Sequence, residues 1–266
     1  MNQVRIEDII QMINKNTSLY HDFKVNLGEA LIEYVSSDRT VDLNNFERSF
    51  ENLSTTLPHS IAEKVDGYSY QPSTGVMIIN ESYFLRKDIN EKNIYMQMVL
   101  DLLYNNGEIV GFGKPNLKAL NKGLRETIAK NLVGEETIDG PVSDEYVYTQ
   151  LVGRIVGLGI LMEAFKQNKP EILEQQLARY GLDKVNELAE YNVFRNQSPD
   201  RVSQLARIQI QLYRISEMKN LNTDDIVNNM VFSSKVLDDG KHKNLDSMKD
   251  IIPYKVQNIN ANSKTI

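Results

Sequence analysis

The stretch that decides the fold is EKNIYMQMVLDLLYNNG, residues 91–107, at the centre of the chain. Apolar side chains cover nearly every face of a helix drawn over residues 91–104, which predicts a helix that is buried on most sides. Asp101 is the only charged residue within the apolar part of this helix. Gly107 then ends the helical pattern, since glycine readily takes the left-handed conformation found at helix C-termini.

Two short strands are predicted before this helix, over residues 65–70 and 75–80, with a turn at residues 71–74 between them. The second strand is apolar without alternation, which predicts that it is buried. After the helix, a glycine-bearing loop connects to another helix over residues 117–132, which follows a capping asparagine. This order places one buried helix between a small β region and a second helix.

Helical patterns fill most of the remaining chain. The spacing of apolar residues and the capping signals predict helices over residues 4–13, 19–35, 42–53, 143–165, 170–179, 183–193, 199–218 and 223–233. The fold class is therefore α+β and predominantly α-helical. We expect a helical N-terminal region over residues 1–63, a core with the C-terminal helices over residues 64–239, and a flexible tail over residues 240–266.

The composition is that of an ordinary globular protein. Of 266 residues, 41% are hydrophobic and 25% are charged, which is enough apolar material for a sizeable core. The formal net charge of −6 argues against nucleic acid as a partner, because a nucleic-acid binder needs a strongly basic face. The absence of cysteine excludes disulfides, thiolate metal sites and a cysteine nucleophile.

The sequence also bears on location. No apolar stretch approaches the length that spans a bilayer, so we expect no membrane partner. Residues 1–8, MNQVRIED, carry acidic side chains where a secretory signal peptide would carry an apolar run. We therefore expect a soluble, cytoplasmic protein, although a chain whose signal peptide had been removed would look the same.

The order of strand, buried helix, glycine-bearing loop and second helix resembles the active-site region of zincin-like metallopeptidases of the gluzincin type. In that family an edge strand precedes a helix that carries H-E-x-x-H, and a second helix supplies a glutamate ligand in a run such as N-E-G-x-x-E. The matching runs here are LDLLY at residues 100–104 and NKGLRE at residues 121–126. The resemblance covers about residues 65–195. It implies a small mixed β-sheet packed on the central helix.

This chain departs from the family at the reactive positions. Leu100 and Tyr104 stand at the two histidine positions, Asp101 stands at the general-base position, and Lys122 stands at the third-ligand position. Glu126 matches the family's second glutamate. Zinc hydrolysis needs two imidazoles one helical turn apart and a carboxylate base beside them. The resemblance therefore implies a catalytically inactive, metallopeptidase-like protein without metal or other cofactor, whose vestigial cleft binds a peptide or protein partner.

The histidines of the chain agree with this interpretation. There are three, His21, His59 and His242, and none has a histidine partner three or four residues away. Helical zinc sites use such a spacing to place two imidazoles on one face. The sequence therefore provides no helical zinc motif.

The same residues also admit structural interpretations. Asp101 either forms an ion pair with Lys122 or lies at the rim of its helix and meets water. Glu126 follows Lys122 by four residues, a spacing that favours a local helix pair worth about half a kcal/mol. Tyr104 is interpreted as a packing residue rather than as a catalytic acid.

Two other functions remain open from the sequence. The chain fits an all-helical scaffold or regulatory module that is unrelated to peptidases. It also fits a metal-independent hydrolase that uses carboxylates such as Asp101 and Glu126, although no motif points to that chemistry.

Overall fold

The computed structural model describes residues 6–38, 40–56, 67–86, 89–133, 143–194 and 201–218. The chain divides into two compact units. Unit 1 comprises residues 1–113, 125–140 and 164–170, and unit 2 comprises residues 114–124, 141–163 and 171–266. The domain boundary expected near residue 64, the helix expected at 223–233 and the tail expected at 240–266 lie outside the described residues.

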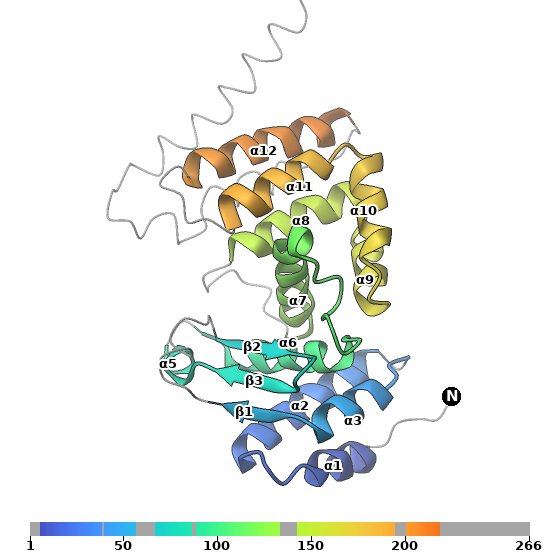
Figure 1. The fold of residues 1–266 in the computed structure, drawn as a ribbon, viewed down its shortest axis with the longest axis vertical. Coiled ribbons are helices and arrows are strands. Elements are labelled where there is room, and N and C mark those ends of the chain that lie inside the picture. Colours follow the sequence, from blue (N-terminus) through green and yellow to red (C-terminus); the bar gives the residue numbers. More distant parts are fainter. Residues whose placement is uncertain are drawn as a thin grey trace, which may run out of the picture. The chain divides into compact units, whose positions relative to one another are not determined.

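Three helices open unit 1: α1 (Ile6–Lys15), α2 (His21–Ser37) and α3 (Asn44–Glu51) (Figure 1). Each lies within a few residues of its predicted position. The reason is visible in α1, where Ile9, Met12 and Ile13 fall on one face at helical spacing and are buried. α1 packs against α2, and both α2 and α3 pack against the central helix α6 (Glu91–Leu103).

Helix α6 confirms the prediction of a buried central helix. Asn90 caps its first turn by accepting a hydrogen bond from the Lys92 backbone N–H at 3.0 Å. Its side chains from Met98 to Leu103 are all buried, including Asp101. The helix ends one residue earlier than predicted, at Leu103, and a short helix, α5 (Glu81–Phe84), lies before it.

A three-stranded mixed sheet completes unit 1. It consists of β1 (Ser54–Thr56), β2 (Tyr68–Gln71) and β3 (Val76–Ile79) in the order β1-β3-β2. β2 and β3 form the predicted antiparallel hairpin, whereas β1, which was not predicted, pairs parallel with β3.

The prediction that the second hairpin strand is buried is only partly right. Met77 is fully buried, but the other three residues of β3 are half-buried. Val76 and Ile78 point to the other face of the sheet, and Ile79 is the last residue of the strand. Tyr70 pairs with Met77 and Tyr68 pairs with Ile79, so these four side chains share a face. That face is turned toward α6, since Tyr68 is hydrogen-bonded to Asp101.

The chain beyond α6 is helical. Its elements are η1 (Pro115–Leu117), α7 (Lys118–Val133), α8 (Asp144–Val156), α9 (Leu158–Lys166), α10 (Pro170–Arg179), α11 (Asp183–Leu188), the π-helix η2 (Ala189–Phe194) and α12 (Arg201–Met218). The division into units assigns the first part of α7, up to Leu124, to unit 2 and the part from Arg125 to unit 1.

The single long helix predicted over residues 143–165 is wrong. The chain bends by 107° between α8 and α9. Gly157, at the bend, has a φ of 106°, in a region that residues with a Cβ rarely adopt. The glycine therefore ends α8, although its position within an apolar run resembles that of a mid-helix residue.

The structure confirms a predominantly helical α+β protein with a small mixed sheet. Within the described ranges, no single helix has both the length and the apolar character needed to cross a bilayer. α8 and α9 reach that length and composition only when they are taken together across their bend.

Candidate functional site

A buried charged cluster lies at the centre of unit 1. Asp101, on α6, is 1% exposed. Arg125 Nη1 donates to both of its carboxylate oxygens, at 2.7 Å to Oδ1 and 2.5 Å to Oδ2. The Tyr68 hydroxyl, on β2, donates to Oδ2 at 2.9 Å and lies 3.4 Å from Arg125 Nη1. The cluster therefore ties α6 to the sheet and to the second part of α7.

The electrostatics of this cluster follow from its burial. Burial raises the pKa of Asp101, and the positive charge and hydrogen bonds of Arg125 oppose that shift. Burial likewise raises the pKa of Tyr68 well above its usual value. For Arg125, burial acts to lower the pKa, but the adjacent carboxylate outweighs it and the net shift is upward. Arg125 thus keeps its charge, as a buried carboxylate requires of its partner.

This geometry replaces both interpretations of Asp101 made from the sequence. The carboxylate does not lie at the rim of the helix, and the structure pairs it with Arg125 rather than with Lys122. A general base needs an oxygen within hydrogen-bond reach of the proton it removes. Here each oxygen already accepts a hydrogen bond from a buried or half-buried side chain.

Lys122 and Glu126 lie one turn apart on α7 but are assigned to different units. Lys122 Nζ donates to Glu145 Oε1, on α8, at 3.0 Å within unit 2. Glu126 Oε1 lies 3.9 Å from Lys130 Nζ within unit 1. The Lys122 ammonium therefore faces a carboxylate.

The two positions where the resemblance calls for histidine carry packing side chains. Leu100 is completely buried. The Tyr104 hydroxyl is hydrogen-bonded to the Tyr34 hydroxyl at 2.8 Å, and its ring meets Phe165 edge-on at 5.6 Å between centroids. Lys166 Nζ lies 5.9 Å above the same ring. Burial raises the pKa of Tyr104, so its hydroxyl keeps its proton at neutral pH.

Sequence reasoning missed Arg125 and Tyr68 as members of this cluster. Arg125 stands in the NKGLRE run, one residue before Glu126, the candidate site residue. Tyr68 alternates with Tyr70 along β2, which would have shown that the two share a face. No sequence pattern, however, indicates the register that brings Tyr68 over Asp101.

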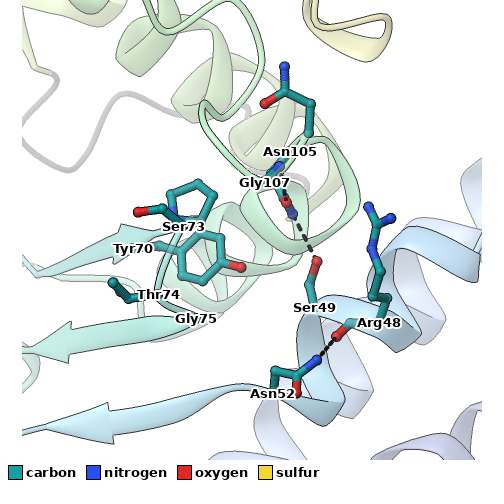
Figure 2. A pocket seen from close by; sticks show the side chains of 11 residues that line it. Arg48, Ser49, Asn52, Tyr70, Ser73, Thr74, Gly75, Asn105 and Gly107 are labelled. Atoms are coloured by element: carbon teal, nitrogen blue, oxygen red, sulfur yellow. Dashed lines mark hydrogen bonds between the residues drawn. The ribbon is translucent and has the colours of Figure 1, made fainter.

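Unit 1 also contains a polar pocket beside the C-terminal end of α6 (Figure 2). Its volume is about 460 Å³. The walls come from three places: α3, the β2–β3 hairpin and the loop after α6. The lining residues are Arg48, Ser49, Asn52, Tyr70, Pro72, Ser73, Thr74, Gly75, Asn105, Asn106 and Gly107.

Possible metal ligands are scattered over the part of the chain that the structure describes. There, no group of three or more histidine, aspartate or glutamate side chains is arranged to hold a metal ion. His21 is exposed on α2, whereas His59 and His242 lie outside the described residues.

Comparison with known proteins adds no relative to this description. No protein-family model, curated protein sequence or solved structure matches the chain.

Proposed function

We propose that this chain is a catalytically inactive, metallopeptidase-like protein that binds a peptide in unit 1 without cleaving it. The observation that carries the proposal is the Asp101–Arg125 pair. The residue at the general-base position of the motif is a buried carboxylate with a hydrogen-bonded cation, and its role is to join α6, β2 and α7.

The other motif positions support the same proposal. Leu100 offers no ligand atom and is completely buried. The Tyr104 hydroxyl is hydrogen-bonded to the Tyr34 hydroxyl. Lys122 places a positive charge where the family has a glutamate, and Glu145 stabilises that charge. Each substitution is built into local packing, which favours a structural role for these positions over a reactive one.

A binding role is supported by the pocket at the end of α6. Its volume is within the usual range for sites that hold small ligands or a short piece of peptide. β2 lies at one edge of the sheet and lines the pocket through Tyr70, so a peptide would meet both backbone hydrogen-bonding groups and polar side chains there.

A zinc-loading experiment tests the inactive part of the proposal. The purified chain is incubated with excess zinc, passed through a desalting column and submitted to elemental analysis. We expect far less than one zinc per chain. Stoichiometric, tightly held zinc would refute the claim that the motif has lost its metal.

A peptide-retention experiment tests the binding part. The immobilised chain is incubated with a tryptic digest of casein, and retained and unretained peptides are identified by mass spectrometry. We expect a subset of peptides to be retained and recovered intact. New cleavage products would contradict the inactive assignment, and the absence of any retained peptide would contradict peptide binding.

A further inference from the structure

The pocket of unit 1 carries one formal charge, and that charge is positive. Arg48 supplies it, and none of the other ten lining residues is an aspartate, glutamate, lysine or arginine. Among the described residues, no carboxylate lies within ion-pair distance of Arg48. Its hydrogen-bond partner is instead the neutral Asn45 side-chain oxygen, at 2.5 Å from Nη2.

Arg48 is held in place from the end of α6. Asn45 Nδ2 donates to the backbone oxygens of Leu103 and Asn105, both at 2.7 Å, and its own oxygen accepts from Arg48. The guanidinium has five N–H donors, so most of them are left for another acceptor. An exposed, positioned guanidinium at a pocket wall is the ordinary way to bind a carboxylate.

The rest of the pocket lining offers neutral hydrogen-bonding groups. Asn105 Nδ2 donates to Ser49 Oγ at 3.0 Å, and Ser49 lies beside the Tyr70 hydroxyl. Burial raises the pKa of Tyr70, so its hydroxyl stays protonated and able to donate at neutral pH. Figure 2 shows Ser49 and Arg48 on α3, with Tyr70 across the pocket from them. A ligand would therefore meet one cation, Arg48, and uncharged polar groups both beside it and across the pocket.

We propose that this pocket binds the carboxylate of a peptide C-terminus, with Arg48 as the anion-binding residue and Tyr70 as a hydrogen-bond donor to the adjacent part of the peptide. The choice of a peptide as the source of the carboxylate rests on the proposed function. A free amino acid carries the same chemistry, and the pocket volume accommodates either one.

An NMR titration tests the inference. The probes are N-acetyl-alanyl-alanine with a free carboxylate, the same dipeptide as its C-terminal amide, and free alanine. The readouts are the backbone amide signals of Ser73, Thr74 and Gly107 at the pocket, and those of Tyr68 and Ser69 along β2. We expect the free acid to shift the pocket signals and to bind at least about tenfold more tightly than the amide, because charge-assisted hydrogen bonds to the carboxylate are lost in the amide.

Two variants and a matched control sharpen the test. Arg48→Met keeps much of the side chain's length and removes its charge, and we expect affinity for the free acid to fall about tenfold or more. Tyr70→Phe removes only the hydroxyl, and we expect a smaller, several-fold loss. Arg214→Met makes the same substitution at an exposed position of α12, and we expect it to bind like the unmodified chain.

The outcomes separate this inference from the proposed function. Equal affinity for acid and amide, or undiminished binding by Arg48→Met, would overturn the carboxylate site. Shifts confined to Tyr68 and Ser69 would also overturn it, while leaving peptide binding intact. Binding of free alanine at the pocket without binding of the acetylated dipeptide would support the carboxylate site and contradict the peptide as its natural ligand.

Discussion

Gly123 allows α7 and α8 to approach closely within unit 2, and replacing it with alanine should destabilise the protein. A Cβ atom at this position would lie 2.1 Å from the Glu145 backbone oxygen and 2.2 Å from Thr149 Oγ1. Real Cβ atoms essentially never come within 3.0 Å of such atoms. The obstacle at Glu145 is backbone, and Thr149 is completely buried, so neither can move aside as a flexible side chain would.

The magnitude follows from these distances. Restoring an ordinary contact of 3.4 Å from 2.1 Å requires the two helices to separate by about 1.3 Å. Overpacking of this kind costs about 3 kcal/mol, at the upper end of the usual range. The higher helix propensity of alanine offsets about 1 kcal/mol of this cost. We therefore expect Gly123→Ala to lower the free energy of unfolding by about 2 kcal/mol, and Tm by about 4–8 °C.

Gly159→Ala provides the matched control. Gly159 lies in α9, and nothing lies within 4 Å of a Cβ built there. This variant should gain up to about 1 kcal/mol from helix propensity. The assay is urea unfolding followed by far-UV circular dichroism for both variants and the unmodified chain. If Gly123→Ala proved as stable as Gly159→Ala, the close packing of α7 on α8 would be refuted.

Three further predictions concern buried polar groups. Arg125→Met leaves the Asp101 carboxylate buried without its cation, so we expect a loss of about 3–5 kcal/mol in urea unfolding, largely recovered when Asp101→Asn is added. Tyr104→Phe removes one of the two paired hydroxyls and should cost about 1 kcal/mol in the same assay, because Tyr34 loses its partner. Glu190 is 6% exposed and burial raises its pKa to about 7, above its ordinary value of 4.5. The folded state therefore holds the Glu190 proton more tightly than the unfolded state does. The free energy of unfolding should fall by up to roughly 3 kcal/mol as pH rises from 4.5 through 7. Glu190→Gln should flatten that dependence in urea midpoints measured at pH 5 and pH 8.

The predictions for Arg125 and Glu190 each have a contradicting result. An Arg125→Met chain as stable as the unmodified protein would mean that the Asp101 carboxylate is solvated. An Arg125→Met/Asp101→Asn chain no more stable than the single variant would mean that the loss comes from packing instead of charge. Equal pH dependence in Glu190→Gln and the unmodified chain would assign the pH effect to other groups.

The sequence was sufficient to predict the elements whose evidence is local. α6 is predictable from an apolar run that leaves a helix no polar face, and the hairpin from two short runs with a turn between them. β1 was missed because it has only three residues, Ser-Thr-Thr, and becomes a strand through parallel pairing with a distant segment. The break at Gly157 was missed because a glycine inside an apolar run has the same sequence signature whether it bends the chain or permits helix contact.

Of the residues singled out from the sequence, the buried cluster contains Asp101, whose partners Arg125 and Tyr68 were not selected. Residues 100–104 supply Asp101 to the cluster, and residues 121–126 supply Arg125 instead of the predicted Lys122 or Glu126. Which cation meets Asp101 depends on where each side chain of α7 points. Lys122 and Arg125 stand three residues apart, and tertiary packing decides between them. The pocket was not predicted, because its walls come from three segments that are separated in sequence and joined by asparagine side chains.

The Asp101–Arg125 pair also has a consequence for the evolution of this chain. Loss of either partner leaves an isolated buried charge, which is more costly than either the intact pair or its replacement by two apolar residues. Any path that changes the two positions one at a time passes through an unstable intermediate. Once both residues are in place, a change at position 101 or 125 alone lowers stability, so replacing the pair requires coordinated substitutions. We expect the two residues to be inherited together and to change together.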